Sequence, residues 1–96
     1  MVMMVHYIGI LPMGVEAASL DEHWRSHVRA TQETKFRHWT GAPSWLDERP
    51  HKQLDWGTVL YEVTPDDLAA LSGQANFRLP PLGEGERYAA VWVECY

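Results

Sequence analysis

The feature that most limits how this chain can fold is a run of apolar residues at positions 2–11. The run is rich in β-branched and aromatic residues and is apolar on both alternating faces, which is typical of a central strand. Residues 87–96 predict a second strand of the same kind, and the chain is therefore expected to build a sheet that is covered on both faces. Its alternating faces carry Tyr88, Trp92 and Tyr96 on one side, and Val91, Val93 and Cys95 on the other.

Residues 58–63 predict another strand, which leads directly into a helix start. In Thr64-Pro65-Asp66-Asp67 the threonine caps, the proline fits the first helical position and the aspartates favour the positive end of the helix dipole. Gly73 offers a left-handed stop, so this helix is expected to be about two turns long. The strand places Val59, Tyr61 and Val63 on one face.

A long helix is predicted over residues 20–38. Ser19 followed by Glu22 forms the S-x-x-E pattern, in which each side chain satisfies a backbone donor at the helix start, so the N-cap is placed at Ser19. At helical spacing one stripe of this segment is formed by Leu20, Trp24, Val28 and Thr31.

The segment 40–57 follows no helical or strand period for long. It contains Gly41, Pro43 and Pro50 together with two tryptophans. Loops of this length are uncommon in compact domains and tend to be binding loops or elements that were not recognised. Two interpretations stay open: a functional loop, or a short edge strand within the segment.

The order of these elements predicts one α+β domain over residues 1–96. A small ferredoxin-like sandwich fits best, with a three- or four-stranded, mostly antiparallel sheet, one long helix and one short helix. If the face that carries Tyr88, Trp92 and Tyr96 has no helix on it, a second copy or another protein must cover it.

The composition describes a small acidic protein. With 96 residues the core is thin, so docking on a partner or oligomerisation would stabilise the fold. The net charge of −5 disfavours nucleic acid as a partner, because nucleic-acid binders show a basic patch or stripe. The basic residues Arg25, Arg29, Lys35 and Arg37 are interleaved with Asp21, Glu22 and Glu33, as on a solvated helix face.

The single cysteine, Cys95, excludes a disulfide or a cysteine zinc cage within one chain. The apolar residues 2–11 lack a basic leader and are too few to span a bilayer. We therefore expect a cytoplasmic protein that does not bind membranes.

Three histidines, His23, His27 and His38, would fall within about 60° of one another on the predicted helix. The spacing of His23 and His27 could begin a metal site, with His51, Asp47, Glu48 or Asp55 completing it, but two ligands are not a site. We predict no metal and no cofactor. If the protein is an enzyme, His23 and His27 are the candidate catalytic residues. Each would act as a general acid or base on the substrate, beside a nearby carboxylate.

The tripeptide His23-Trp24-Arg25, at the start of a helix after a first strand, resembles the helix motif of EthD-like dimeric α+β barrel proteins. In that family a second histidine follows further along the helix, ahead of a small residue and proline, whereas here His27 comes too early and Val28-Arg29-Ala30 follows. The resemblance implies a homodimer with a pocket between helix and sheet, in which His23 or His27 lies near a small apolar ligand.

Tryptophans on or near the irregular segment favour a protein-binding function over an enzyme. Tryptophan is enriched at interfaces because its large apolar body ends in an N–H that needs a partner. We predict an accessory subunit or inhibitor in a protein complex, or a homo-oligomer; the alternative is the EthD-like homodimer acting on a small apolar molecule by histidine chemistry. The predicted partner-binding residues are Trp39, Trp45, Trp56 and His51.

Overall fold

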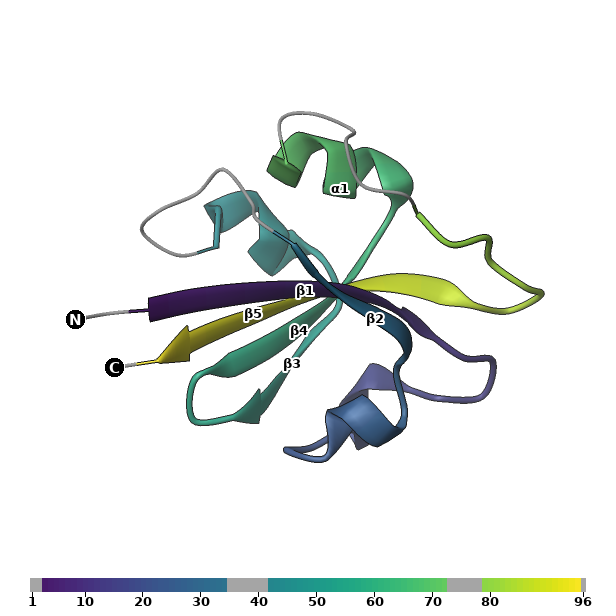
Figure 1. The fold of residues 1–96 in the computed structure, drawn as a ribbon, viewed down its shortest axis with the longest axis horizontal. Helices are drawn as coiled ribbons and strands as arrows, with labels where there is room; N and C mark the ends of the chain where they lie inside the picture. Colours follow the sequence, from purple (N-terminus) through teal and green to yellow (C-terminus); the bar gives the residue numbers. More distant parts are fainter. Residues whose placement is uncertain (1–2, 35–41, 73–78, 96) are drawn as a thin grey trace.

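A computed structural model describes residues 3–34, 42–72 and 79–95. These residues form a five-stranded antiparallel sheet, one α-helix and three short 3-10 helices (Figure 1). None of the helices in these ranges has the length and apolar character needed to cross a bilayer. The elements in chain order are β1 (Met3–Leu11), η1 (Ala17–Ser19), η2 (Trp24–Ser26), β2 (Arg29–Thr34), η3 (Ser44–Glu48), β3 (His51–Asp55), β4 (Thr58–Val63), α1 (Pro65–Ser72) and β5 (Arg87–Cys95).

The strand order in the sheet is β2-β1-β5-β4-β3, and every neighbouring pair is antiparallel. The two longest strands, β1 and β5, pair over their full length, from Met3 opposite Cys95 to Leu11 opposite Arg87. The strands predicted at residues 2–11 and 87–96 are thus confirmed as central strands. The predicted strand at 58–63 is β4, and the predicted short helix is α1.

The sheet has an apolar layer on each face. We call the side that packs against α1 and η3 the helix face, and the side that packs against η1 and η2 the turn face; Figure 1 shows the sheet edge-on between them. The buried helix-face strand residues are Ile8, Ile10, Tyr61, Val63, Tyr88, Ala90 and Trp92, and those of the turn face are Leu11, Leu54, Leu60, Ala89 and Val91.

The helix face is covered by the chain itself. Leu46 of η3 and Leu68 and Leu71 of α1 are each 0% exposed and pack against this face. The side of the sheet that carries Tyr88 and Trp92 is therefore not free of helices. The expectation that a second copy or another protein must cover this face depended on the face having no helix. It therefore does not apply to the described residues; Tyr96 lies outside them.

The long helix predicted over residues 20–38 is wrong in its described part. The Ser19 hydroxyl donates to the Glu16 carbonyl at 2.7 Å instead of capping a helix, and the Asp21 carboxylate accepts the His23 backbone N–H at 2.8 Å. Such local bonds compete with helix formation. The chain makes the short turn η2 and then enters β2, and residues 35–38 lie outside the described ranges.

Residues 20–38 still contribute the apolar contacts that the helical spacing suggested. Leu20, Trp24 and Val28 are 3%, 4% and 5% exposed and belong to the turn-face core. These three side chains reach the turn-face core from the turns that precede β2, and β2 then pairs with β1. Pairing with a central strand outweighed the local helix signal in this segment.

The α+β class is confirmed, while the ferredoxin-like arrangement and the two-helix count are not. The sheet has five strands in place of three or four, because β2 arises within the predicted helix and β3 within residues 40–57. The edge-strand interpretation of that segment is confirmed by β3, which ends the sheet beside β4.

Candidate functional site

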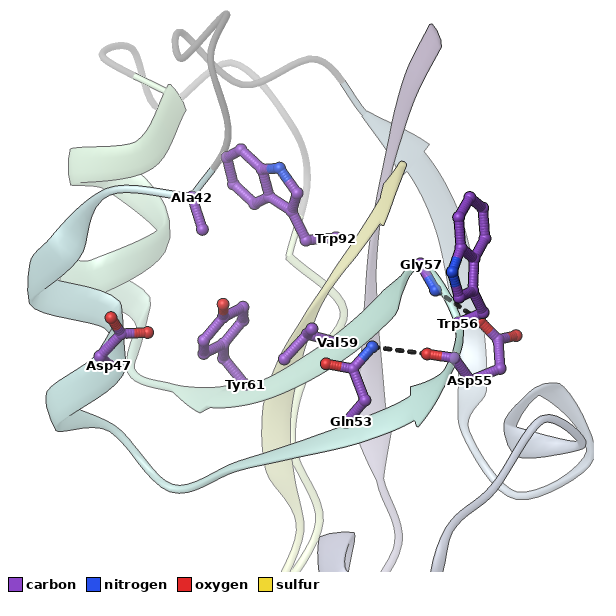
Figure 2. Close-up of a pocket in the computed structure, with 9 residues that line it drawn as sticks. All are labelled: Ala42, Asp47, Gln53, Asp55, Trp56, Gly57, Val59, Tyr61 and Trp92. Atoms are coloured by element: carbon purple, nitrogen blue, oxygen red, sulfur yellow. Dashed lines mark hydrogen bonds between the residues drawn. The ribbon is translucent and has the colours of Figure 1, made fainter. Parts of the chain in front are cut away.

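A groove of about 730 Å³ opens on the helix face, between η3 and the β3–β4 hairpin (Figure 2). This volume is in the range of pockets that hold small ligands or side chains of a partner. Its described lining residues combine aromatic rings, carboxylates and an amide: Ala42, Asp47, Gln53, Asp55, Trp56, Gly57, Val59, Tyr61 and Trp92.

One row of the sheet forms the floor of the groove. Trp92 of β5 lies opposite Val59 of β4, which in turn lies opposite Gln53 of β3. Residues directly opposite one another in a sheet point to the same face, so these three side chains form a continuous row. Tyr61, two positions after Val59, adds a second ring on the same face.

The β3–β4 turn forms one side of the groove. The Gly57 N–H donates to the backbone oxygen of Asp55 at 2.9 Å and to its carboxylate at 3.2 Å. The Gln53 amide donates to the backbone oxygens of Asp55 at 2.5 Å and Thr58 at 3.3 Å. These bonds fix the turn, and they leave the Trp56 side chain 78% exposed at its tip.

The other side of the groove belongs to the η3 segment, which is held in place by α1. Arg49 donates to both carboxylate oxygens of Asp67, at 2.9 and 3.0 Å. Asp67 also accepts the Thr64 N–H at 3.1 Å, and its own N–H donates to the Thr64 hydroxyl at 3.2 Å, which caps α1. The hydrogen bond from Arg49 is the main reason that the pKa of Asp67 is lowered. The pair fixes the segment that carries Asp47.

The described lining of the groove is acidic. Figure 2 shows Asp47 on the η3 side and Asp55 on the hairpin side, with Tyr61 between them in this view. No lysine or arginine is among the described residues that line it. Lys52 neighbours Gln53 in β3 and therefore points to the turn face, and Arg49 is occupied by Asp67. An acidic groove with aromatic rings favours cationic groups over anionic ones.

The structure separates the predicted partner-binding residues. Trp56 lies in the groove, whereas Trp45 is half-buried against the helix-face core with the Arg49 guanidinium 5.5 Å from its ring centroid. His51 is exposed, and its ring lies 5.6 Å from that of Tyr61. Trp39 lies outside the described residues. Of the set, Trp56 contributes to the groove directly, and His51 contacts one of its rings.

The predicted catalytic histidines lie across the sheet from the groove. His23 and His27 flank η2 on the turn face, and both are exposed. The His23 imidazole is 3.6 Å from the Glu22 carboxylate. Without a helix, the spacing of His23 and His27 no longer places them on one helical face, and His38 lies outside the described residues.

The residues that resemble the EthD-like motif have a structural role. Trp24 is 4% exposed in the turn-face core. The Arg25 guanidinium lies 4.6 Å from the centroid of Tyr7 and 5.2 Å from that of Trp24. His23-Trp24-Arg25 therefore fixes η2 to the sheet by burial and by cation–π contact.

Sequence reasoning missed most of the groove. The alternation at 58–63 placed Val59 and Tyr61 on the same face of one strand, and the alternation at 87–96 placed Trp92 on one face of another. The sequence did not indicate that these two strand faces lie side by side beneath η3. In the described ranges no three His, Cys, Asp or Glu side chains are grouped so that they could hold a metal ion.

Searches of protein-family models, curated proteins and solved structures find no match to this chain.

Proposed function

We propose that this chain is a small acidic protein-binding domain that acts in the cytoplasm as an accessory subunit or inhibitor within a protein complex. The observation that carries the proposal is the 78% exposure of Trp56 at the edge of the groove. Trp24 and Trp92, by contrast, are 4% and 3% exposed. Tryptophans that become buried in an interface contribute more binding energy than most other residues.

The occupant that the groove favours is a positively charged segment of the partner. Asp47 and Asp55 flank the groove, and the whole chain carries a net charge of −5. Complementary charge raises the rate of encounter and disfavours acidic partners. The apolar floor then gives the segment a surface on which to bury its side chains.

Native mass spectrometry of the tagged protein purified from its own host tests the proposal. We expect a heteromeric complex for the wild type, and its loss for Trp56→Ala with an unchanged melting temperature. Met13→Ala is the matched control, because Met13 is 69% exposed and follows β1 at the opposite end of the sheet. This variant should keep the complex.

Two results would overturn the proposal. If Trp56→Ala and Met13→Ala retain the complex equally, the hairpin tip is not the binding surface. If the wild type is a homodimer that carries a small apolar molecule, the EthD-like alternative gains, with His23 or His27 in acid–base chemistry.

A further inference from the structure

We propose that the outer edge of β3 pairs with the same strand of a second copy of this chain, so that two five-stranded sheets join into one. The inference goes beyond the proposed function, because it concerns two copies of this chain and not a different partner. The observation that carries it is the order of side chains along β3, which is complementary in charge to itself when reversed.

Strand β3 ends the sheet, and among the described residues it pairs with β4 alone. The structure describes β3 together with the residues on both sides of it, whereas the opposite edge strand, β2, stops where a described range stops. The side chains of His51, Gln53 and Asp55 are exposed. An edge strand presents N–H and C=O groups to which a further strand can bond. The described edge that can accept such a strand is therefore β3.

The backbone of β3 alternates between groups that face β4 and groups that face outward. The Glu62 N–H donates to the Pro50 carbonyl oxygen at 2.8 Å, and the register of the two strands continues from there to Gln53. In an antiparallel ladder, hydrogen-bonded pairs alternate with pairs that exchange no hydrogen bond. The N–H and C=O groups of His51 and Gln53 therefore point away from β4, toward the open edge.

One register of two antiparallel copies matches the side chains of this edge. If Gln53 lies opposite Gln53 of the second copy, His51 of each copy lies opposite Asp55 of the other. Nδ1 of His51 lies 2.9 Å from the Arg49 carbonyl oxygen, to which it donates, so Nε2 is left for the second copy. As an imidazolium, His51 would donate from Nε2 to the carboxylate of Asp55. The two-fold axis makes this contact occur twice.

The neighbouring register is disfavoured. If the two copies met about Lys52, the two lysines would lie directly opposite one another, and like charges in that position destabilise a strand pair. In the register about Gln53, each Lys52 instead lies opposite Leu54 of the other copy, and its alkyl stem can pack there.

The pairing brings a residue of the second copy to the groove. Gln53 and Asp55 line the groove (Figure 2), and residues opposite one another in a sheet point to the same face. The two helix-face grooves would then lie side by side across the junction. Each groove would receive His51 of the other copy beside its own Asp55.

The contact is small. A register shift between Gln53 and Asp55 interrupts the regular strand, and each copy carries a net charge of −5. Small interfaces are typical of transient association, so we expect a reversible dimer with a dissociation constant above about 10 μM.

Sedimentation velocity of the purified wild-type chain measures the dimer, and amide hydrogen exchange locates it. The measurements are made at about pH 6, where histidine side chains carry part of their positive charge. The N–H groups of His51 and Gln53 should exchange more slowly as the protein concentration rises, whereas that of Lys52, which faces β4, should not change. A chain that stays monomeric at about 1 mM would overturn the inference.

Two variants add the same positive charge two positions apart on one face of β3. Gln53→Lys places two lysines opposite one another at the two-fold axis and should weaken the dimer at least about fivefold. His51→Lys is the matched control, because its lysine lies opposite Asp55, and it should dimerise at least as tightly as the wild type. Circular dichroism melting curves establish that both variants fold.

A third variant removes the acidic member of the pair. Asp55→Asn still accepts the Gly57 N–H and should weaken the dimer by about threefold. Equal dimerisation of the two lysine variants, or of Asp55→Asn and the wild type, would overturn the inference.

This inference and the proposed function can fail separately. If the purified chain stays monomeric but Trp56→Ala abolishes the heteromeric complex, the edge pairing falls and the proposed function stands. If Gln53→Lys breaks the dimer and His51→Lys keeps it, while the complex survives Trp56→Ala, the edge pairing stands and the proposed function falls.

Discussion

Arg49 and Asp67, 18 positions apart, join η3 to the first turn of α1 through two hydrogen bonds of 2.9 and 3.0 Å. The same aspartate exchanges hydrogen bonds with Thr64 at the start of the helix. One carboxylate thus caps α1 and holds the segment that forms a side of the groove.

Removal of that carboxylate should destabilise the fold. Asp67→Ala leaves Arg49 without its partner and takes away the cap, and we expect the free energy of unfolding to fall by about 2–4 kcal/mol. Urea denaturation followed by circular dichroism measures this. Asp66→Ala, at an exposed position in the same turn, should cost less than about 1 kcal/mol; similar losses for the two variants would contradict the role given to Asp67.

The protein should lose stability in acid. Hydrogen bonds from Arg29 and from the Gly83 N–H lower the pKa of Glu86 from 4.5 to about 2, and the pKa of Asp67 is also lowered. A carboxyl group whose pKa is lower in the folded state stabilises that state above its unfolded pKa and ceases to do so as the pH falls through its folded pKa. Stability should therefore fall from about pH 5 to pH 2.

Urea titrations at several pH values test this expectation. Glu86→Gln should reduce the acid dependence, because it removes one of the two groups whose pKa is lowered and leaves Asp67. Glu84→Gln, at an exposed position nearby, should leave the slope unchanged. An equal slope for Glu86→Gln and the wild type would show that Glu86 does not contribute.

Ala30→Gly should stabilise the protein slightly. Ala30 has a φ of 55°, the left-handed region that costs an L-residue energy and costs glycine none. The greater freedom of glycine in the unfolded chain offsets part of the gain, so we expect about 0.5 kcal/mol net, measured by thermal unfolding. Ala70→Gly on the exposed side of α1 should instead destabilise by about 1 kcal/mol.

Gly9→Ala should be strongly destabilising. A Cβ atom at this position would lie 2.5 Å from Cγ1 of Val28, where η2 packs on β1. Overpacking of this kind costs about 1–3 kcal/mol. The double variant Gly9→Ala with Val28→Ala should recover part of the loss caused by Gly9→Ala, and a double-mutant cycle without coupling would contradict the contact.

The two tryptophans of the groove should respond differently to truncation. Trp92→Ala empties a core position that is 3% exposed and should cost about 3–5 kcal/mol. Trp56→Ala should change stability by less than about 0.5 kcal/mol. Denaturant titrations of both variants check this, and a large loss for Trp56→Ala would indicate a packing role instead of a binding role.

The predictable part of the fold is the part in which local pattern and tertiary pairing agree. The strands at both chain ends and the helix start Thr64-Pro65 carry signals that the sheet then uses unchanged. In residues 20–34 the S-x-x-E pattern and helical spacing pointed to a helix, yet Thr31 and Thr34 suit a strand and β1 offered an edge for pairing. The helical spacing identified Leu20, Trp24 and Val28 as buried because turns can bury the same side chains, but Thr31, the fourth residue of that stripe, is exposed in β2.

The groove was harder to predict than the fold because it depends on contacts between distant residues. Strand pairing brings Asp55, Tyr61 and Trp92 together, and the Arg49–Asp67 pair holds the η3 segment that carries Asp47. A single sequence does not reveal such a pair. Strand β3 has polar His51 and Gln53 on its helix side and a register shift before Asp55, so it lacks the regular apolar alternation that identifies a half-buried strand.

The position of β5 in the sheet also has a consequence for biosynthesis. It lies between β1 and β4, although it is the last of the described strands to be made. Until it emerges from the ribosome, the nascent chain holds only the β1–β2 and β3–β4 hairpins, and isolated hairpins are marginally stable. The complete sheet, and with it the groove floor that includes Trp92, can therefore form only after residues 87–95 have been translated.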